Sequence, residues 1–144
     1  MFAKILFPTD FSELSEKALS YIVKLKDAGT EEVILLHVID TGNLDALIRY
    51  SPLNLMDARN EARDKAMQKM ATFADFLQKK GLKVKIRIEE GTPFDIILKV
   101  ENEERVSNIV MSSHGMSNIK EMLLGSVSEQ VIRNSKTPII IIKR

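Results

Sequence analysis

Short apolar runs recur along the chain, and helical patterns separate them. The runs are Phe2–Phe7, Val33–Val38, the alternating segment Val84–Ile88, Asn108–Met111 and Pro138–Ile142. Continuous apolar runs of this length indicate buried strands, and strict alternation indicates a half-buried one. Charged residues alternate with the apolar ones in the third run, which suits the edge of a sheet.

The segments between the runs carry start and stop signals of helices. The predicted starts are the N-cap Ser12, the sequence Thr92–Asp95 with its proline, and a capping box at Ser126–Glu129. The predicted ends of the first two helices are Gly29 and Gly81. The second helix has the apolar stripe Ala62, Ala66, Met70, Phe73 and Leu77, and packing is expected to explain Met56 and Met67 as well.

Strands and helices therefore alternate throughout, which predicts a parallel sheet with helices on both faces. In such sheets ligands bind beyond the carboxyl ends of the strands, where the strand order reverses. The predicted carboxyl ends are Pro8–Asp10, Val38–Asp40, Glu89–Gly91 and Ser112–Gly115. The long polar connection at 39–54 has the length of a lid or a binding loop.

The last run contains four consecutive isoleucines, Ile139–Ile142, and no charge. An uncovered edge strand of this composition would promote aggregation. The strand is therefore either interior or covered by another chain, and pairing with a symmetry mate is the simplest cover.

Composition narrows the class of protein further. The chain has 144 residues, which is most simply one domain over residues 1–144. A net charge of +1, with Lys and Arg interleaved among Asp and Glu, gives no case for a nucleic-acid or membrane partner. The sequence has no cysteine, which excludes disulfides and thiol catalysis but does not fix the compartment. It has no apolar run long enough for a membrane span and no signal-peptide pattern, so we expect the protein in the cytoplasm.

The candidate chemistry lies in residues 111–126. A small-residue turn at Ser112–Gly115 follows a strand, and a second turn at Gly125-Ser126 opens a helix. Glycines let backbone N–H groups approach an anion, and a helix N-terminus carries partial positive charge. This arrangement predicts a bound nucleotide. Neither His114 nor His37 has triad partners nearby in the sequence, and His37 is expected to be a core residue of its strand.

Residues 108–144 resemble the universal stress protein family, in its ATP-binding branch. The signature of that family is Gly, two residues, Gly, nine residues, then Gly-Ser or Gly-Thr. Gly115 and Gly125-Ser126 match the second part, with nine residues between them, whereas Ser112 stands at the position of the first glycine. The resemblance extends over the whole chain through Lys4–Ser12, Leu35–Val38, Gly91–Pro93 and Thr137–Ile141.

The resemblance implies a doubly wound α/β fold of the adenine-nucleotide α-hydrolase-like type, with five parallel strands in the order 3-2-1-4-5. It also implies a homodimer formed through Pro138–Ile142 and a site for ATP, with Mg²⁺. By position, Pro8, Thr9 and Asp10 would line the adenosine, Asp10 accepting from a ribose hydroxyl, and the Val38 backbone would read the adenine edge. Met111, Ser112, Ser113 and His114 would lie along the ribose and α-phosphate. Backbone N–H groups of Gly115, Gly125, Ser126 and Val127 would hold phosphates, helped by the Ser126 hydroxyl.

Alternatives stay open at several of these residues. Asp10 is also suited to a turn or to an early helix cap, and Ser126 to capping alone. Ser112 adds a side chain where the family has none, which would lower ATP affinity, add a hydrogen bond or favour AMP.

The leading function is therefore a homodimeric, adenine-nucleotide-binding regulator of the stress response, with at most slow ATP hydrolysis and with protein partners that the sequence does not name. The alternative is a nucleotide-free structural or chaperone-like dimer in which Ser112 has disabled the site. A phosphoacceptor receiver domain is disfavoured, because the first strand ends in the lone Asp10 and the third in Glu89-Glu90-Gly91.

Overall fold

The computed structural model describes residues 2–42, 55–113 and 124–143. Its sheet has five strands, all paired in parallel, in the order β3-β2-β1-β4-β5. The strands are β1 (Lys4–Pro8), β2 (Glu32–Asp40), β3 (Lys83–Gly91), β4 (Asn108–Ser112) and β5 (Ile139–Ile142). This order confirms the one implied by the family resemblance.

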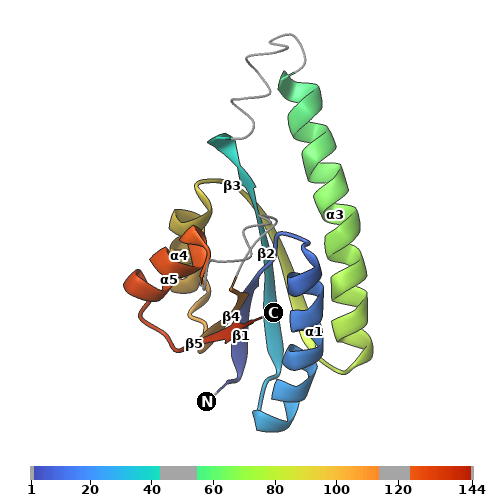
Figure 1. Ribbon diagram of the computed structural model, residues 1–144. Helices are drawn as coiled ribbons and strands as arrows, with labels where there is room; N and C mark the ends of the chain where they lie inside the picture. Colours follow the sequence, from blue (N-terminus) through green and yellow to red (C-terminus); the bar gives the residue numbers. More distant parts are fainter. Residues whose placement is uncertain (1, 43–54, 114–123, 144) are drawn as a thin grey trace.

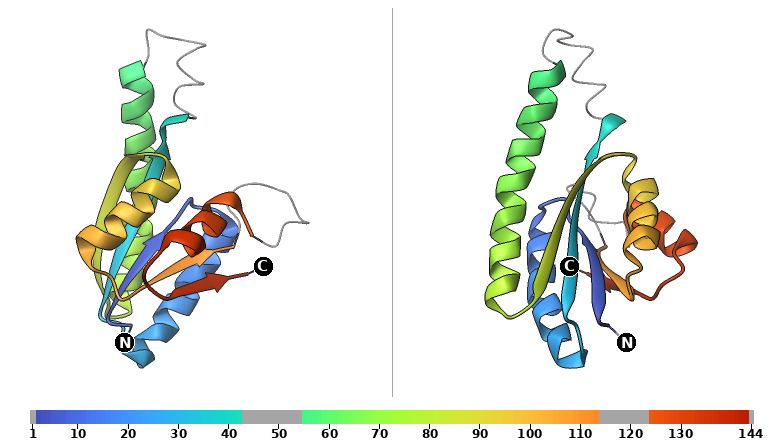
Figure 2. Two further views of the ribbon diagram at one scale, coloured as in Figure 1. Left: turned by 90° about the vertical axis from the view of Figure 1, so that its left-hand side faces the viewer. Right: turned by 180° about the vertical axis from the view of Figure 1, so that it is seen from behind.

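Helices cover both faces of the sheet, as the alternating pattern predicted. They are α1 (Glu13–Leu25), α3 (Leu55–Lys79), α4 (Pro93–Glu104) and α5 (Ser126–Asn134), and the short 3₁₀ helix η1 (Lys26–Ala28) continues α1. Helices α1 and α3 lie on one face, and α4 and α5 lie on the other (Figure 1, Figure 2). Within the described residues, no helix combines the length and apolarity that a membrane span requires.

The two faces explain why the strands read as continuous apolar runs. Along β2, Val33 and Leu35 pack in the cluster under α1 and α3. Ile34 and Leu36 pack in the cluster under α4 and α5. Because successive side chains of a strand point to opposite faces, a strand covered on both sides is apolar at every position.

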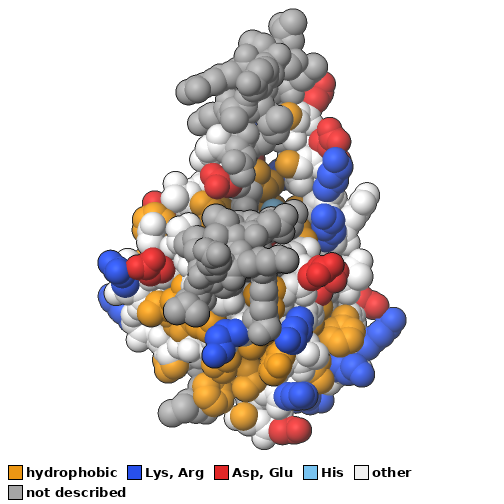
Figure 3. Space-filling model, in the orientation of Figure 1, with side chains coloured by type: hydrophobic (Ala, Val, Ile, Leu, Met, Phe, Trp, Pro, Cys, Tyr) orange, Lys and Arg blue, Asp and Glu red, His pale blue; other side chains and the backbone are white. Residues whose placement is uncertain are grey.

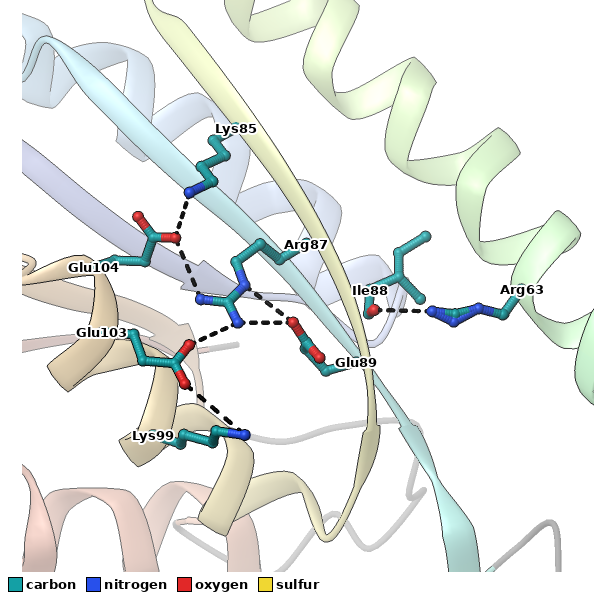
Figure 4. Close-up of polar contacts among 8 residues, drawn as sticks. All are labelled: Arg63, Lys85, Arg87, Ile88, Glu89, Lys99, Glu103 and Glu104. Atoms are coloured by element: carbon teal, nitrogen blue, oxygen red, sulfur yellow. Dashed lines mark hydrogen bonds and ion pairs between the residues drawn. The ribbon is translucent and has the colours of Figure 1, made fainter.

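Strand β3 is an edge strand, as its charges predicted, and those charges also hold α4. Lys85 Nζ lies 2.6 Å from Glu104 Oε1, and Arg87 Nη1 lies 3.2 Å from the same oxygen (Figure 4). Lys4 Nζ of β1 lies 3.4 Å from Glu104 Oε2. The C-terminal turn of α4 is thereby tied to two strands.

The long helix α3 extends beyond the sheet at its N-terminal end (Figure 1). The predicted stripe is buried at Ala66, Met70, Phe73 and Leu77 and half-buried at Ala62. The expectation that packing explains Met56 and Met67 is wrong, because their exposed fractions are 76% and 50%. Arg59 and Arg63 of α3 reach Glu90 and Ile88 O of β3. Met67 lines a hollow together with Ile86 and Ile88, so it borders the sheet without being covered.

Strand β5 forms the opposite edge, so the interior alternative for the isoleucine run is wrong. Ile142 is buried, and Ile139, Ile140 and Ile141 are half-buried. One side of this strand pairs with β4, and no other described strand pairs with its outer side. The other possibility, cover by another chain, stays a prediction.

Candidate functional site

Strands β1 and β4 part at their carboxyl ends. Their pairing ends at Leu6 and Ile109, although β1 continues to Pro8 and β4 to Ser112. By contrast, β1 stays paired with β2 up to Pro8, and β4 with β5 up to Ser112. This is the point where the strand order reverses, and such points hold the ligands of doubly wound sheets. We call it the β1/β4 switch point.

The segment after β1 is fixed by hydrogen bonds of its backbone and side chains. The Thr9 N–H donates to Leu36 O of β2 at 2.8 Å, and the buried Thr9 hydroxyl pairs with the Ser15 hydroxyl of α1. Asp10 Oδ1 accepts from the Ser12 N–H at 3.0 Å. The turn role considered for Asp10 is therefore present, and it uses only one of the two carboxylate oxygens.

Phe11, in the segment after β1, makes an aromatic contact that the sequence pattern does not predict. The rings of Phe11 and His37 have centroids 4.4 Å apart, and Phe11 also meets Phe73 of α3 edge-on at 5.8 Å. Lys69 Nζ lies 5.2 Å from the centre of the Phe11 ring. The Phe11 N–H donates to Thr9 Oγ1 at 3.1 Å. No spacing in the sequence signals a contact between residues that lie on β2 and after β1.

His37 is a satisfied residue, as its position in an apolar strand predicted. Its Nδ1 lies 2.8 Å from Thr9 O, so this nitrogen carries the proton and donates. Burial lowers the pKa of His37 below its ordinary value, and the hydrogen bond to Thr9 and the charge of Asp10 oppose this only in part. The side chain is therefore neutral near pH 7 and links the ends of β1 and β2.

The backbone of Val38 faces past the end of β1. Leu36 O accepts from the Thr9 N–H and so points toward β1. Backbone groups two residues apart on a strand point the same way, so the N–H and C=O of Val38 also point to the β1 side. Strand β1 ends at Pro8, which pairs with Leu36. Beyond it, Val38 offers one donor and one acceptor at the edge of the switch point.

Strand β4 and helix α5 are joined directly across the turn. The Gly125 N–H donates to Ser113 O at 2.6 Å, and the Ser128 hydroxyl donates to Ser112 O at 2.8 Å. Ser113 is fully buried, and its N–H donates to Ile142 O of β5 at 2.9 Å. These bonds fix the start of α5 at the carboxyl end of β4.

The capping box predicted at Ser126 is wrong by one residue. The N-cap of α5 is Gly125, in an extended conformation, and Ser126 is the first helical residue. No side chain caps the helix among the described residues, and Glu129 pairs with Arg133 at 2.7 Å instead. The N–H groups of the first turn have no partner within a helix, so Ser126 and Val127 present donors at the switch point.

Ser112 does not need the conformational freedom of glycine. It is the last residue of β4, paired with Ile142. Among the described non-glycine residues, positive φ angles occur at Phe11 and Arg105 only. The serine therefore sits in ordinary extended backbone, next to the buried Met111.

The predicted site residues thus fall into two groups at the switch point. Pro8, Thr9, Asp10 and Val38 lie on its β1 side, and Met111, Ser112, Ser113, Gly125, Ser126 and Val127 lie on its β4 side. His114 and Gly115 lie outside the described residues. Over residues 2–42, 55–113 and 124–143, no three His, Cys, Asp or Glu side chains are grouped as metal ligands.

These features define a doubly wound α/β protein with donor groups collected where its strand order reverses. A model described as "Universal stress protein family" matches residues 1–143. The chain belongs to the universal stress protein family.

Individual relatives agree along the full length. The chain is 40% identical over 156 aligned residues to universal stress protein MJ0577 of Methanocaldococcus jannaschii, covering 100% of this chain and 96% of that protein. It is 34% identical over 149 residues to universal stress protein YxiE of Bacillus subtilis, covering 99% and 100%.

Solved structures of universal stress proteins also resemble the chain over its full length. The structure of MJ0577 superposes with a TM-score of 0.90 at 42% identity, covering 100% of this chain and 97% of that one. A universal stress protein crystallised in complex with cAMP superposes with a TM-score of 0.62 at 25% identity, covering 99% and 97%.

Proposed function

We propose that this protein binds an adenine nucleotide at the β1/β4 switch point and acts as a nucleotide-responsive regulator. The observation that carries the proposal is the parting of β1 and β4 beyond Leu6 and Ile109, with the uncapped N-terminus of α5 tied to the end of β4. The family relative crystallised with cAMP supports an adenine ligand.

The adenosine half of the ligand would lie on the β1 side. The backbone N–H and C=O of Val38 offer the donor–acceptor pair that an adenine edge requires. Asp10 has a second carboxylate oxygen beyond the one bonded to Ser12, and this oxygen would accept from a ribose hydroxyl. A charged acceptor makes this one of the stronger contacts of the complex.

The phosphates would lie on the β4 side. Backbone N–H groups at Ser126 and Val127 point along the positive end of α5, and the exposed Ser126 hydroxyl adds a donor. With no group of three metal-ligating side chains among the described residues, a Mg²⁺ ion would be held mainly by phosphate and water oxygens. The proposal assigns binding, with hydrolysis at most slow, and places the protein in the cytoplasm.

The test is thermal unfolding with ATP, ADP and AMP, each with Mg²⁺, because a ligand that binds only the folded state raises stability. We expect ATP to raise the unfolding temperature by several degrees and Asp10→Ala to reduce that rise. A rise with AMP alone would assign an AMP-preferring site. No rise with any nucleotide, in the wild type and in Ser112→Gly alike, would refute nucleotide binding. A rise that appears only in Ser112→Gly would mean that the serine closes the site.

We also propose that two copies pair through β5. Pro138 O and Ile142 O accept from the N–H groups of Ile109 and Ser113, so they face β4. By alternation, the backbone groups of Ile139 and Ile141 face the open edge. Orange apolar side chains gather in the lower part of Figure 3, where Figure 1 places β5. Pairing with a second β5 would cover both the backbone and the apolar surface.

A proline placed on each register tests this pairing. Ile141→Pro removes an N–H that faces the open edge, whereas Ile140→Pro removes one that faces β4. We expect Ile141→Pro to give a folded monomer in analytical ultracentrifugation and Ile140→Pro to lose stability as well. A wild-type protein that sediments as a monomer, or an Ile141→Pro variant that stays dimeric, would refute the β5 dimer.

A further inference from the structure

Phe11 adopts a backbone conformation that is unusual for a bulky residue. Its φ angle is +65°, in the left-handed region that favours glycine. Strained residues of this kind persist only where their surroundings hold them, and they cluster at functional sites. Phe11 directly follows Asp10, the residue to which the proposed function gives the ribose contact.

The surroundings of Phe11 hold it from several sides. Its ring lies against His37 of β2 and Phe73 of α3, at centroid distances of 4.4 and 5.8 Å. Its N–H donates to Thr9 Oγ1 at 3.1 Å. Thr9 is itself buried and receives the His37 Nδ1–H on its carbonyl oxygen at 2.8 Å. Asp10 is therefore flanked by two residues that are both anchored on the α1/α3 side.

We propose that Phe11 is a positioning residue, which together with His37 holds the left-handed turn that aims the Asp10 carboxylate at the ribose of a bound nucleotide. This inference rests on the proposed adenine-nucleotide site. Asp10 Oδ1 is bonded to the Ser12 N–H, one residue beyond Phe11, so the φ angle of Phe11 sets where this carboxylate can lie. Its second oxygen then keeps one direction in the absence of ligand, which lowers the ordering cost of binding.

The contacts that hold Phe11 affect the proposed ribose contact and not the proposed adenine contact. Val38 would contact adenine through its backbone, which the sheet fixes independently of Phe11. A change at Phe11 should therefore weaken the ribose contact selectively. A general loss of packing would instead weaken every part of the ligand alike.

The experiment compares ATP with 2′,3′-dideoxy-ATP by calorimetric titration, at neutral to mildly alkaline pH where His37 is neutral. In the wild type, we expect loss of the ribose hydroxyls to weaken binding by about tenfold or more, as for a hydrogen bond to a charged acceptor. In Phe11→Leu, we expect the two ligands to bind within about threefold of each other. Phe11→Gly should do the same, because it removes the ring that holds the turn in one conformation, while glycine tolerates the left-handed region and so guards against misfolding. Phe76→Leu, at an exposed aromatic residue of α3, is the matched control and should keep the wild-type ratio of the two affinities.

The outcomes separate the two proposals. If the wild type binds neither ligand, the nucleotide site fails and this inference fails with it. If the wild type binds and discriminates, and the Phe11 variants lose affinity for both ligands with the ratio unchanged, Phe11 is only a packing residue and the inference is refuted while the nucleotide site stands. If the wild type binds both ligands equally, Asp10 makes no ribose contact and the positioning role is refuted.

Discussion

Glu101 is a buried carboxylate that organises the turn leading into β5. It lies on α4 with an exposed fraction of 4%. Its Oε1 accepts from the Lys136 and Thr137 N–H groups at 3.2 and 3.1 Å, from the Thr137 hydroxyl at 2.8 Å and from the Ser135 hydroxyl at 2.5 Å. One oxygen thus gathers the whole connection between α5 and β5.

The cost of removing Glu101 follows from which donors keep another partner. The Ser135 and Thr137 hydroxyls lie 3.3 Å apart and can bond to each other, and the Thr137 N–H has a second acceptor in the Ser135 hydroxyl at 3.2 Å. The Lys136 N–H has no second acceptor among the described residues. Losing the charge-assisted bonds and leaving this donor unpaired should cost Glu101→Ala about 2–4 kcal/mol of unfolding free energy. Glu101→Gln keeps an acceptor oxygen and loses the charge, which should cost about 1 kcal/mol.

Urea unfolding followed by circular dichroism measures both values from the shift in midpoint at constant slope. Asn102→Ala, at the next and exposed residue of α4, is the control and should stay within about 0.5 kcal/mol of the wild type. The same variants should be run by analytical ultracentrifugation, because a loosened turn would also displace β5. If Glu101→Ala unfolds within 1 kcal/mol of the wild type, the donors are satisfied without the carboxylate and the reasoning is wrong.

Three further predictions concern other parts of the molecule. A hydrogen bond from Lys85 of β3 lowers the pKa of Glu104 in the folded state. The contribution of Glu104 to stability is therefore present above the pKa of an unfolded glutamate and is lost as the pH falls through the lower, folded pKa. The difference in unfolding free energy between the wild type and Glu104→Gln, measured by urea unfolding, should close in acid. Gly91→Ala should lower the urea midpoint by the equivalent of about 1–3 kcal/mol, since φ there is +150° and an added Cβ would lie 2.9 Å from the Ile96 side chain; an unchanged midpoint would contradict this. Limited peroxide should oxidise Met56 and Met67 before the fully buried methionine of the same helix, as read by peptide mass spectrometry.

The alternation of strands and helices could be predicted because a strand buried on both faces is a continuous apolar run in the sequence. Val33–Val38 is apolar because helices cover both sides of β2, and the charges around Val84–Ile88 mark an edge that pairs with α4. The apolar pattern of α3 predicts more burial than the N-terminal part of this helix has. Met56 and Met67 keep the composition of a packed helix, yet both stay exposed, Met67 in a hollow beside Ile86 and Ile88 of β3.

At the candidate site, the sequence predicted the backbone groups but not the hydrogen bonds of the side chains. The family signature located Gly125-Ser126, but the capping pattern placed the helix start one residue late. The Ser128 hydroxyl, two residues into α5, bonds back to Ser112 O of β4, and no local rule anticipates that bond. Local rules describe what a side chain can do with its own helix, whereas here the adjacent strand takes the bond.

The left-handed conformation of Phe11 could not be predicted from the sequence. Glycine and asparagine announce a left-handed turn in a sequence, and phenylalanine does not. Its ring lies against His37, which is 26 positions away along the chain and is brought alongside by the pairing of β1 with β2. The same pairing places Thr9 O on His37 Nδ1 and turns the Val38 backbone past the end of β1. A residue that looks like a core histidine in the sequence therefore belongs to the support of the proposed adenosine site, and only the register of the sheet reveals it.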